Sequence, residues 1–252
     1  MTNDQIKQLT LELKFGGIRE SFAIRCEEAA SHALSYAEFL RLILEDEIKS
    51  RKEASAKKVL SKAKFRFAAD LEDWDQSFER GLTKQKLREL GSLSFATNNE
   101  NLIIVGGTGA GKTHLAVALG RRLCADNTST MFLPVNFLFE EVQAARAAGR
   151  YMSYIKKITQ TKVIILDDFG LRSYSHEEAN VLVDLLEDRH RKGSVITTSQ
   201  ANPKGWMKLF EDPLIAEAIV NRLECPGHQV HITGPSYRDR LQSLPLGKKN
   251  LA

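Results

Sequence analysis

From about residue 93 onward, short aliphatic runs alternate with stretches whose apolar residues recur every three or four positions. The runs are apolar throughout rather than alternately apolar and polar, which is typical of strands that are buried on both faces. Strands that alternate with helices predict an α/β domain over residues 93–252, in which helices cover both faces of a parallel sheet. The predicted strands are 102–105, 130–133, 162–166, 194–198 and 229–232.

Residues 1–70 have a different pattern, which predicts a small all-α N-terminal domain. Ser35 and Glu38 have the spacing of a capping box, and Leu34 and Phe39 flank it as a hydrophobic staple, so a helix is predicted to begin there. The residues predicted to be buried on one face of this helix are Phe39, Leu40, Ile43 and Leu44, with Ile48 as a further candidate.

Residues 71–92 connect these two patterns. Acidic residues surround Trp74, and a short helical pattern follows over 84–90. We therefore predict a connector of 71–92 between a helical domain of 1–70 and the α/β domain of 93–252.

The composition sets limits on the class of protein. With 252 residues, 42% hydrophobic and 27% charged, the chain is typical of a soluble globular protein of one large domain or a core domain with an appendage. Its three cysteines are widely spaced and form no C-x-x-C pair, which argues against a disulfide framework or a zinc site and favours a reducing cytoplasm. No apolar run reaches the ~18 residues of a membrane span, so we expect a cytoplasmic protein that is neither secreted nor membrane-spanning.

Positive charge is concentrated in the stretch from residue 49 to residue 66. The chain as a whole has a formal net charge of +4, yet this stretch alone holds one acid, Glu53, among many cations. A polar helical end of this kind lies either in solvent or against a polyanion. Its cations are Lys49, Arg51, Lys52, Lys57, Lys58, Lys62, Lys64 and Arg66.

The strongest functional signal is a complete G-x-x-x-x-G-K-[ST] phosphate-binding loop between the predicted strand 102–105 and a helical pattern. Its glycines let successive backbone N–H groups point into one concavity, Lys112 brings charge to the β- and γ-phosphates of ATP, and Thr113 can ligate Mg²⁺. His114 follows at the start of the helix, where packing is a more common role than catalysis. The predicted nucleotide-binding residues are Gly106, Gly107, Thr108, Gly109, Ala110, Gly111, Lys112, Thr113 and His114.

Two carboxylates, Asp167 and Asp168, follow the aliphatic run Val163–Leu166. They lie at the carboxyl end of a predicted strand, where ligands of open α/β sheets bind. We expect Asp167 to hold Mg²⁺ and Asp168 to orient or deprotonate an attacking water. A second acid beside the metal ligand favours a hydrolase over a nucleotide kinase.

Three further positions are candidates for contact with the nucleotide. A polar residue after the strand 194–198 could contact the γ-phosphate or the water; Ser199 is our choice, with Thr198 and Gln200 as alternatives. Arg222 could extend to the γ-phosphate of a neighbouring subunit, and Arg238 could close over the nucleotide. From the residues alone, each arginine is interpreted as an ordinary surface residue.

The motifs, taken together and in order, resemble the IstB-type ATPases. These are AAA+ helper proteins of bacterial insertion sequences, and they are similar to the DnaC helicase loaders. The resemblance covers nearly the whole chain, and its combination with the helical N-terminus is specific to the family. The matching stretches are 15–18, 34–38, 45–51, 63–65, 111–116, 164–170, 198–200, 221–223 and 234–238.

The resemblance implies an AAA+ fold of the ASCE P-loop class and ATP-dependent homo-oligomers on duplex DNA, with nucleotide at the subunit interfaces. Arg222 would be an arginine finger acting in trans, Arg238 a sensor-2 residue acting in cis, and Ser199 the sensor-1 position. The partner would be an IstA-type transposase, for which the ATPase selects and remodels target DNA.

The basic stretch 49–66 is then the first candidate for contact with DNA phosphates, and a second basic cluster within 146–162 is a weaker one. Two alternatives remain open. A DnaC-type helicase loader would prefer single-stranded DNA and bind a helicase. A small-molecule phosphotransferase would need a defined acceptor, and the basic stretch would have no purpose in it.

Overall fold

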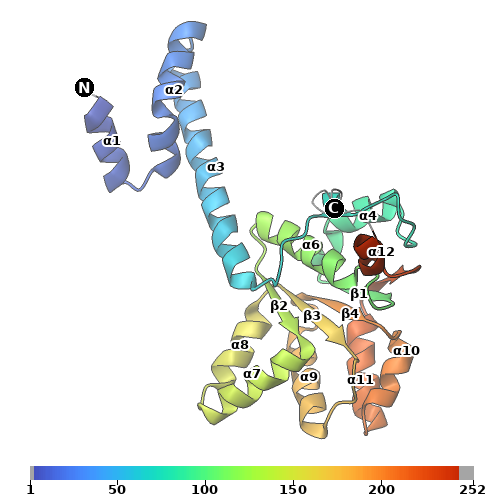
Figure 1. Cartoon of the computed structure of the whole chain (residues 1–252). Coiled ribbons are helices and arrows are strands. Elements are labelled where there is room, and N and C mark those ends of the chain that lie inside the picture. The colour runs from blue at the N-terminus through green and yellow to red at the C-terminus, as the bar shows by residue number, and fades with distance from the viewer. Residues whose placement is uncertain (1–2, 244–252) are drawn as a thin grey trace. The chain divides into compact units, whose positions relative to one another are not determined.

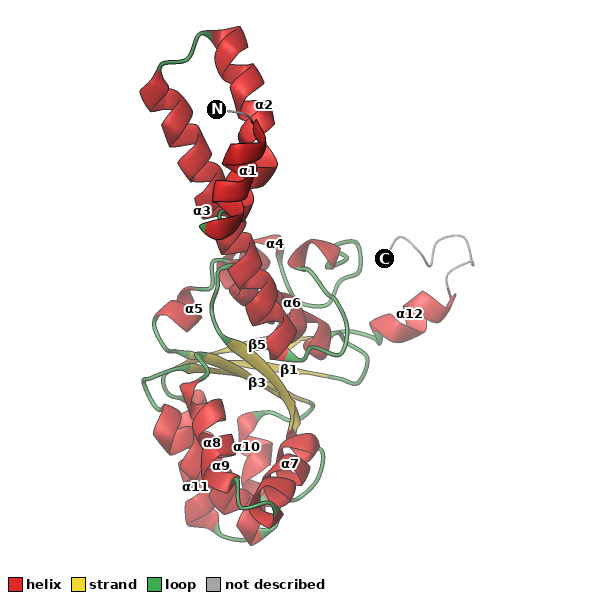
Figure 2. Ribbon diagram, turned by 90° about the vertical axis from the view of Figure 1, so that its left-hand side faces the viewer, coloured by secondary structure: helices red, strands yellow, loops and turns green. Residues whose placement is uncertain are grey.

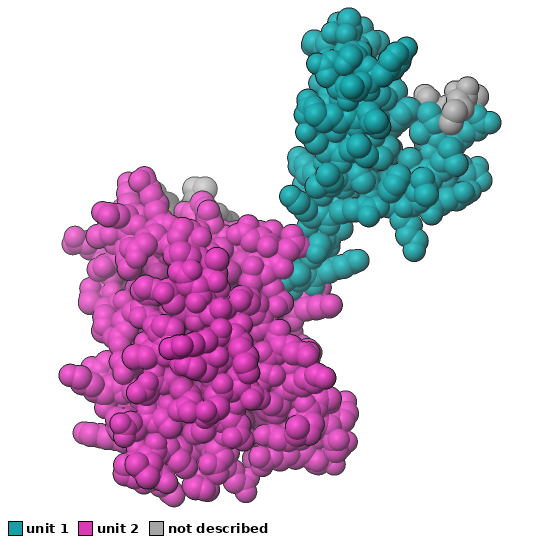
Figure 3. Space-filling model, turned by 180° about the vertical axis from the view of Figure 1, so that it is seen from behind, with its two compact units in different colours: residues 1–59 teal, residues 60–252 magenta. Residues whose placement is uncertain are grey.

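The computed structural model describes residues 3–243 and divides the chain into two compact units, residues 1–59 and residues 60–252 (Figure 1 and Figure 3). The first unit contains α1 (Asn3–Glu12), α2 (Gly16–His32) and most of α3 (Tyr36–Ala63). The division lies between residues 59 and 60, within α3, rather than at the predicted residue 70.

The start of α3 is fixed by the predicted capping box. The Glu38 backbone N–H donates to Ser35 Oγ at 3.3 Å, and the Ser35 N–H donates to Glu38 Oε2 at 2.9 Å. Each bond satisfies a backbone donor that the first turn of a helix leaves without an intrahelical partner.

The start of α2 depends on α3. The Glu47 carboxylate is buried and accepts hydrogen bonds from the backbone N–H groups of Gly17 and Ile18, at 2.8 and 3.2 Å. A Cβ at Gly17 would lie 2.6 Å from the Asp46 carbonyl oxygen, so glycine is required for this close approach. Glu47 therefore neutralises the positive end of α2 across the helix–helix contact.

The buried face of α3 differs from the prediction. Ile43 is buried and Phe39 is half-buried against Phe22, but Leu40, Leu44 and Ile48 are 48–56% exposed. The reason is that the face of α3 turned toward α2 passes through Ile43 and Glu47, which are four residues apart, and Leu40, Leu44 and Ile48 fall on a neighbouring face.

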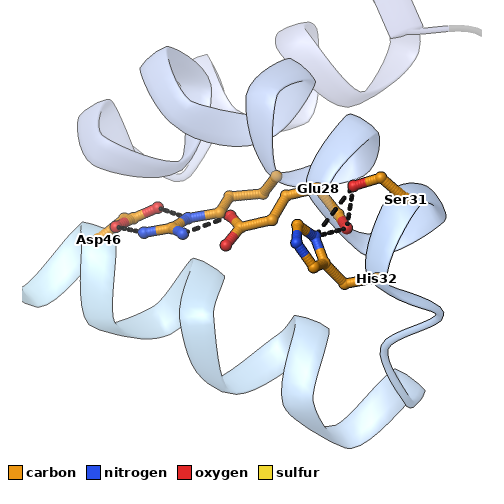
Figure 4. Close-up of polar contacts among 5 residues, drawn as sticks. Glu28, Ser31, His32 and Asp46 are labelled. Atoms are coloured by element: carbon orange, nitrogen blue, oxygen red, sulfur yellow. Dashed lines mark hydrogen bonds and ion pairs between the residues drawn. The ribbon is translucent and has the colours of Figure 1, made fainter.

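An ion-pair cluster joins α2 to α3. Arg25 forms two hydrogen bonds with Asp46, at 2.8 and 2.9 Å, and one with Glu28 at 2.6 Å; Figure 4 shows Asp46 and Glu28 on facing helices. The bonds from Arg25 lower the pKa of Asp46 to about 2.

The second unit is built on a five-stranded parallel sheet with the order β2-β3-β4-β1-β5 (Figure 2). The five strands confirm the predicted α/β class and lie close to the predicted runs. They are β1 (Asn101–Gly106), β2 (Thr130–Pro134), β3 (Val163–Phe169), β4 (Ser194–Ser199) and β5 (Gly227–Ile232).

Helices cover both faces of this sheet. Their bounds are α4 (Lys84–Gly91), α5 (Ser94–Thr97), α6 (Lys112–Ala125), α7 (Val135–Ala147), α8 (Tyr151–Gln160), α9 (His176–Arg189), α10 (Pro203–Trp206), α11 (Pro213–Glu224) and α12 (Tyr237–Ser243), with short 3₁₀ turns at Leu71–Asp73 and Met207–Leu209. Figure 2 shows α4, α5 and α6 on one face and α7 to α11 on the other.

Successive residues of a strand serve the two cores in turn. Leu102 and Ile104 of β1 pack with the α6 side, and Ile103 and Val105 pack with the α7–α11 side. This alternation of contacts on a strand without polar positions follows from the period of two residues along a strand.

The predicted connector is part of the second unit. Residues of 71–92 are buried in the same core as β1 and α6, because their apolar side chains, spaced along the segment, pack beside α6. The buried apolar residues of the segment are Trp74, Leu82, Leu87 and Leu90. No helix within the described residues has both the length and the apolar character that crossing a membrane requires.

The buried cation Arg189 stabilises the sheet at the edge where its strands begin, opposite the edge that carries the phosphate loop. Arg189 at the end of α9 is 1% exposed and donates to the carbonyl oxygens of Ile158, Thr161, Lys162 and Ser194, at 2.6–3.0 Å. Burial lowers its pKa to about 10, so it stays charged at neutral pH. The side chain thereby ties the start of β3 to the start of β4.

We expect acid to weaken the first unit through Asp46. Its pKa is about 2 in the folded protein, against an ordinary value of 3.8. Because the folded value is the lower one, the stabilisation is complete above about pH 4 and is lost as the pH falls toward 2. Asp46→Asn should cost about 1 kcal/mol at pH 5 and almost nothing near pH 2, measured by thermal unfolding under circular dichroism. The control is Glu45→Gln, which removes an exposed pair with Arg41. A difference between Asp46→Asn and wild type that is independent of pH would contradict this assignment.

Candidate nucleotide site

The phosphate loop lies between β1 and α6, as predicted. Gly109 and Gly111 have φ values of +76° and +105°, a backbone conformation that side chains rarely adopt. A Cβ at Gly111 would also lie 2.8 Å from the Arg80 guanidinium. The loop thus has the left-handed turns that point backbone N–H groups toward a bound anion.

Lys112 is the first residue of α6 and is 6% exposed. Its Nζ donates to the Gly107 carbonyl oxygen at 2.9 Å. Burial lowers the pKa of Lys112, and the charges of Asp168 and Asp167 oppose that shift. A buried ammonium inside an anion-binding loop, beside the positive end of a helix, suits a polyphosphate.

A cavity of about 620 Å³ opens in front of the loop. It brings together the phosphate loop, both predicted acids and the predicted sensor-2 arginine. Its lining residues are Arg66, Phe67, Thr108, Gly109, Gly111, Lys112, Thr113, His114, Asp167, Asp168, Leu171, Gln200, Tyr237 and Arg238.

Asp167 is 2% exposed at the end of β3 and is held by two hydroxyl groups. Its Oδ1 accepts hydrogen bonds from Thr113 Oγ1 at 2.9 Å and from Thr198 Oγ1 at 2.7 Å. Burial raises the pKa of Asp167, while the two hydroxyl bonds lower it. The carboxylate and the Thr113 hydroxyl are the oxygen donors that Mg²⁺ prefers, so the residues present fit this cation.

Asp168 lines the cavity from an irregular stretch of β3. The register of β3 against β4 shifts between Leu166 and Phe169, and Asp168 has a φ of +60°. Its backbone N–H donates to Thr198 Oγ1 at 3.0 Å. A non-glycine residue in this conformation costs about 1–3 kcal/mol, and such strain is common at functional sites.

The end of β4 requires a correction to the prediction for Ser199. Its hydroxyl is fully buried, donates to the Phe169 carbonyl at 2.7 Å and accepts from Trp206 Nε1 at 3.0 Å. Of the two alternatives, Gln200 lines the cavity, where its Oε1 accepts from Thr108 Oγ1 at 3.0 Å. Thr198 is buried beneath the cavity lining and contacts Asp167. The register shift in β3 explains the error, because it pairs Phe169 rather than Asp168 with Ser199.

Arg238 lies in the cavity wall at the start of α12. The adjacent Tyr237 N–H donates to the Gly109 carbonyl at 3.0 Å, which ties this helix to the phosphate loop. The positive charge of Arg238 contributes to the lowered pKa of Lys112, after burial. The structure therefore brings this predicted residue to the nucleotide site of its own chain.

Arg80, which the sequence does not predict as a site residue, contacts the phosphate loop. Its guanidinium lies between two aromatic rings, 3.7 Å from the Trp74 centroid and 4.2 Å from that of Tyr237, and donates to the Ala110 carbonyl at 3.3 Å. Burial lowers the pKa of Arg80. No pattern in the sequence marks this residue.

Arg222 is not part of the cavity. It lies near the end of α11, where its guanidinium contacts Glu187 at 2.6 Å and the Ala218 carbonyl at 3.2 Å. Its own carbonyl accepts from Asn101, at the end of β1 remote from the phosphate loop. The structure does not bring Arg222 to the phosphate loop of its own chain.

The predicted DNA-contacting residues separate into two groups. All eight side chains are exposed, and the six from Lys49 to Lys62 lie on α3, where Arg51 pairs with Glu47 at 2.7 Å. Lys64 and Arg66 follow the helix, and Arg66 lines the nucleotide cavity.

Comparisons with known proteins agree with this site. The chain is 34% identical over 212 residues to a protein of insertion sequence IS21 from Pseudomonas aeruginosa that is named as ATP-binding; the match covers 84% of this chain and 80% of that one. It is 33% identical over 229 residues to an insertion-sequence protein from Mycobacterium tuberculosis, also named as ATP-binding, with 90% and 91% covered.

Solved structures share the fold of the second unit. DnaI superposes with a TM-score of 0.58 at 22% identity, over 66% of this chain and 91% of that one. The DnaC helicase loader superposes with a TM-score of 0.55 at 20% identity, over 66% and 97%. The replication initiator DnaA, bound to an ATP analogue and single-stranded DNA, gives 0.56 at 19% identity, over 73% and 56%.

These neighbours share the arrangement of the sheet and its helices. The family model described as IstB-like ATP binding protein matches residues 6–244, nearly the whole chain. With its phosphate loop, paired acids and helical first unit, this chain belongs to the family of IstB-like ATP-binding proteins.

Proposed function

We propose that this protein is an ATPase that assembles on duplex DNA in the ATP-bound state, to select and remodel target DNA for a partner transposase. The observation that carries the proposal is the cavity in which the phosphate loop, Asp167 and Asp168 converge. Membership of a family whose relatives are named for insertion sequences gives the proposal its biological setting.

In hydrolysis, each residue would act from the position described above. The backbone of the loop and Lys112 hold the phosphates, and Thr113 and Asp167 hold Mg²⁺, which neutralises charge on the phosphates when bound. Asp168 accepts a proton from water or orients it toward the γ-phosphate. Thr198 fixes both acids, because its hydroxyl bonds to the Asp167 carboxylate and to the Asp168 backbone.

In assembly, Arg222 would act on the nucleotide of a neighbouring subunit and Arg238 on the nucleotide of its own. The remote position of Arg222 from its own loop supports a role in trans. An ATP site that needs a second chain for its last cation links hydrolysis to assembly. When two subunits meet, Arg222 would have to leave its ion pair with Glu187 in order to bind the phosphate of the neighbouring nucleotide.

For DNA, the exposed cations of α3 are the proposed contacts with phosphates. No base-reading motif accompanies them, so we expect little sequence preference. The helicase-loader alternative rests on fold likeness at 20–22% identity over two thirds of the chain, whereas the insertion-sequence relatives match at 33–34% over 84–90%.

We expect large complexes on a duplex of ~50–60 bp only with ATP, as measured by sedimentation velocity. Lys112→Ala should abolish them through loss of phosphate binding, and Arg222→Ala through loss of the shared site. The control, Lys204→Ala, removes an exposed cation that lines neither the nucleotide cavity nor the pocket beside Arg222, and it should assemble normally. Assembly that ignores nucleotide, or that occurs on single-stranded DNA alone, would favour the loader.

Replacing Lys57, Lys58 and Lys62 together with Gln should weaken duplex binding and reduce its salt dependence. Each lost phosphate contact lowers the slope of log K against log salt by about 0.9, so the slope should fall by up to about 3. Fluorescence anisotropy at several salt concentrations measures it. The matched control carries Gln at the exposed Lys192, Lys204 and Lys208, and an equal effect in the control would rule out a specific surface.

The isolated protein should hydrolyse ATP slowly, well below the ~10 s⁻¹ typical of enzymes. The side chain of Asp168 is one methylene shorter than that of a glutamate, and without a neighbouring subunit Arg222 has no nucleotide site to complete. Asp168→Asn should reduce the remaining turnover about 100-fold or more, while ATP affinity changes by no more than about threefold. Steady-state phosphate release and nucleotide titration separate the two effects. Asp184→Asn, at an exposed position of α9, is the control. Fast hydrolysis without DNA would show the reasoning on Asp168 to be incorrect.

A further inference from the structure

The segment that follows α3 lies in the nucleotide site. Arg66 and Phe67 line the same cavity as Lys112 and Asp167, although they come only three and four residues after the end of α3. The charge of Arg66 is close enough to Asp167 to oppose the rise in the pKa of that carboxyl. A cation that sequence analysis assigns to DNA therefore faces the nucleotide cavity.

Two aromatic contacts hold this segment in place. Phe65 is half-buried, with its ring 6.2 Å from that of Phe132, and a Cβ at Gly120 would lie 2.8 Å from the Phe65 ring. Phe67 stacks on His114 of α6, with ring centroids 6.4 Å apart and an interplanar angle of 27°. The residues on both sides of Arg66 are thus fixed on the second unit, and this restricts the directions in which the Arg66 side chain can extend.

The guanidinium of Arg66 is available for a ligand. Lys112 donates to its own loop and Arg51 pairs with Glu47, but Arg66 forms no hydrogen bond or ion pair with the part of the chain that the structure describes. It is exposed and lines the cavity together with Asp167. Arginine presents a planar fork of donors that matches phosphate oxygens, and this suits the end of a polyphosphate beside the metal-binding acid.

We propose that Arg66 binds the terminal phosphate of the nucleotide held by the phosphate loop of the same chain, and thereby couples nucleotide state to the segment that leads into α3. The proposal rests on the proposed function in one respect, that ATP occupies this cavity. Arg66 then distinguishes triphosphate from diphosphate, and the cations from Lys49 to Lys64 remain for DNA. Nucleotide exchange releases or restrains the chain at the C-terminal end of the basic helix.

The test is a titration of mant-ATP and mant-ADP, with Mg²⁺ and without DNA, against wild type and variants. Arg66→Ala should weaken mant-ATP binding about tenfold and mant-ADP binding by less than about threefold, because only the triphosphate carries the contacted group. Arg66→Lys, which keeps the charge, should recover part of the loss. The matched control Lys64→Ala removes an exposed cation two residues away that does not line the cavity.

Hydrogen exchange supplies a second readout. Mg²⁺-ATP should protect the amides of residues 64–70 in wild type and in Lys64→Ala, and this protection should be lost in Arg66→Ala. Unchanged mant-ATP affinity in Arg66→Ala, or equal losses in Arg66→Ala and Lys64→Ala, would overturn the proposal. Because no DNA is present, failure of duplex assembly in wild type would count against the proposed function alone.

Discussion

The Asp167 carboxylate is the interaction on which the rest of the site depends. One oxygen atom, Oδ1, accepts from Thr113 at the start of α6 and from Thr198 near the end of β4, while Asp167 itself ends the regular part of β3. Three elements are therefore fixed relative to one buried charge. Removing that charge would leave two hydroxyl groups without their partner and would uncouple the phosphate loop from the sheet. The strained Asp168 backbone is tolerated because Thr198 also accepts its N–H.

The sheet could be predicted because its strands are apolar on both faces. Leu102 to Val105 supply alternate side chains to two cores, so no polar residue interrupts the run, as is typical of a parallel sheet covered on both faces. The phosphate loop could also be predicted, because its glycines and Lys112 in that order are typical of phosphate binding. The capping box at Ser35 was confirmed for a similar reason, since both of its hydrogen bonds are local in sequence.

The parts that could not be predicted depend on contacts between distant residues. The polar run Thr198–Gln200 does not say which of its side chains contacts Asp167. The register shift pairs Ser199 with Phe169, and Thr198 makes the contact with Asp167. Arg80 and Arg189 are buried cations held by backbone carbonyls and aromatic rings, and nothing in their neighbours' sequence marks them. The exposed Leu40 and Leu44 show that a helical pattern does not say which of its apolar residues another helix will cover.

The unit boundary and Arg66 both show that neighbouring residues of one type do not always belong to a single surface. Composition is continuous across the basic stretch 49–66 and across residues 1–70, so the sequence predicts one patch and one helical domain. The structure divides the chain at residue 59, and the aromatic residues at 65 and 67 hold the last part of the stretch on the second unit. Charge patterning reports solvent exposure well but assigns partners poorly, since a phosphate of DNA and a phosphate of ATP select the same side chains. The apolar residues beside a cation determine the unit on which it is held. They therefore determine whether the cation lies near the phosphates of ATP or near those of DNA.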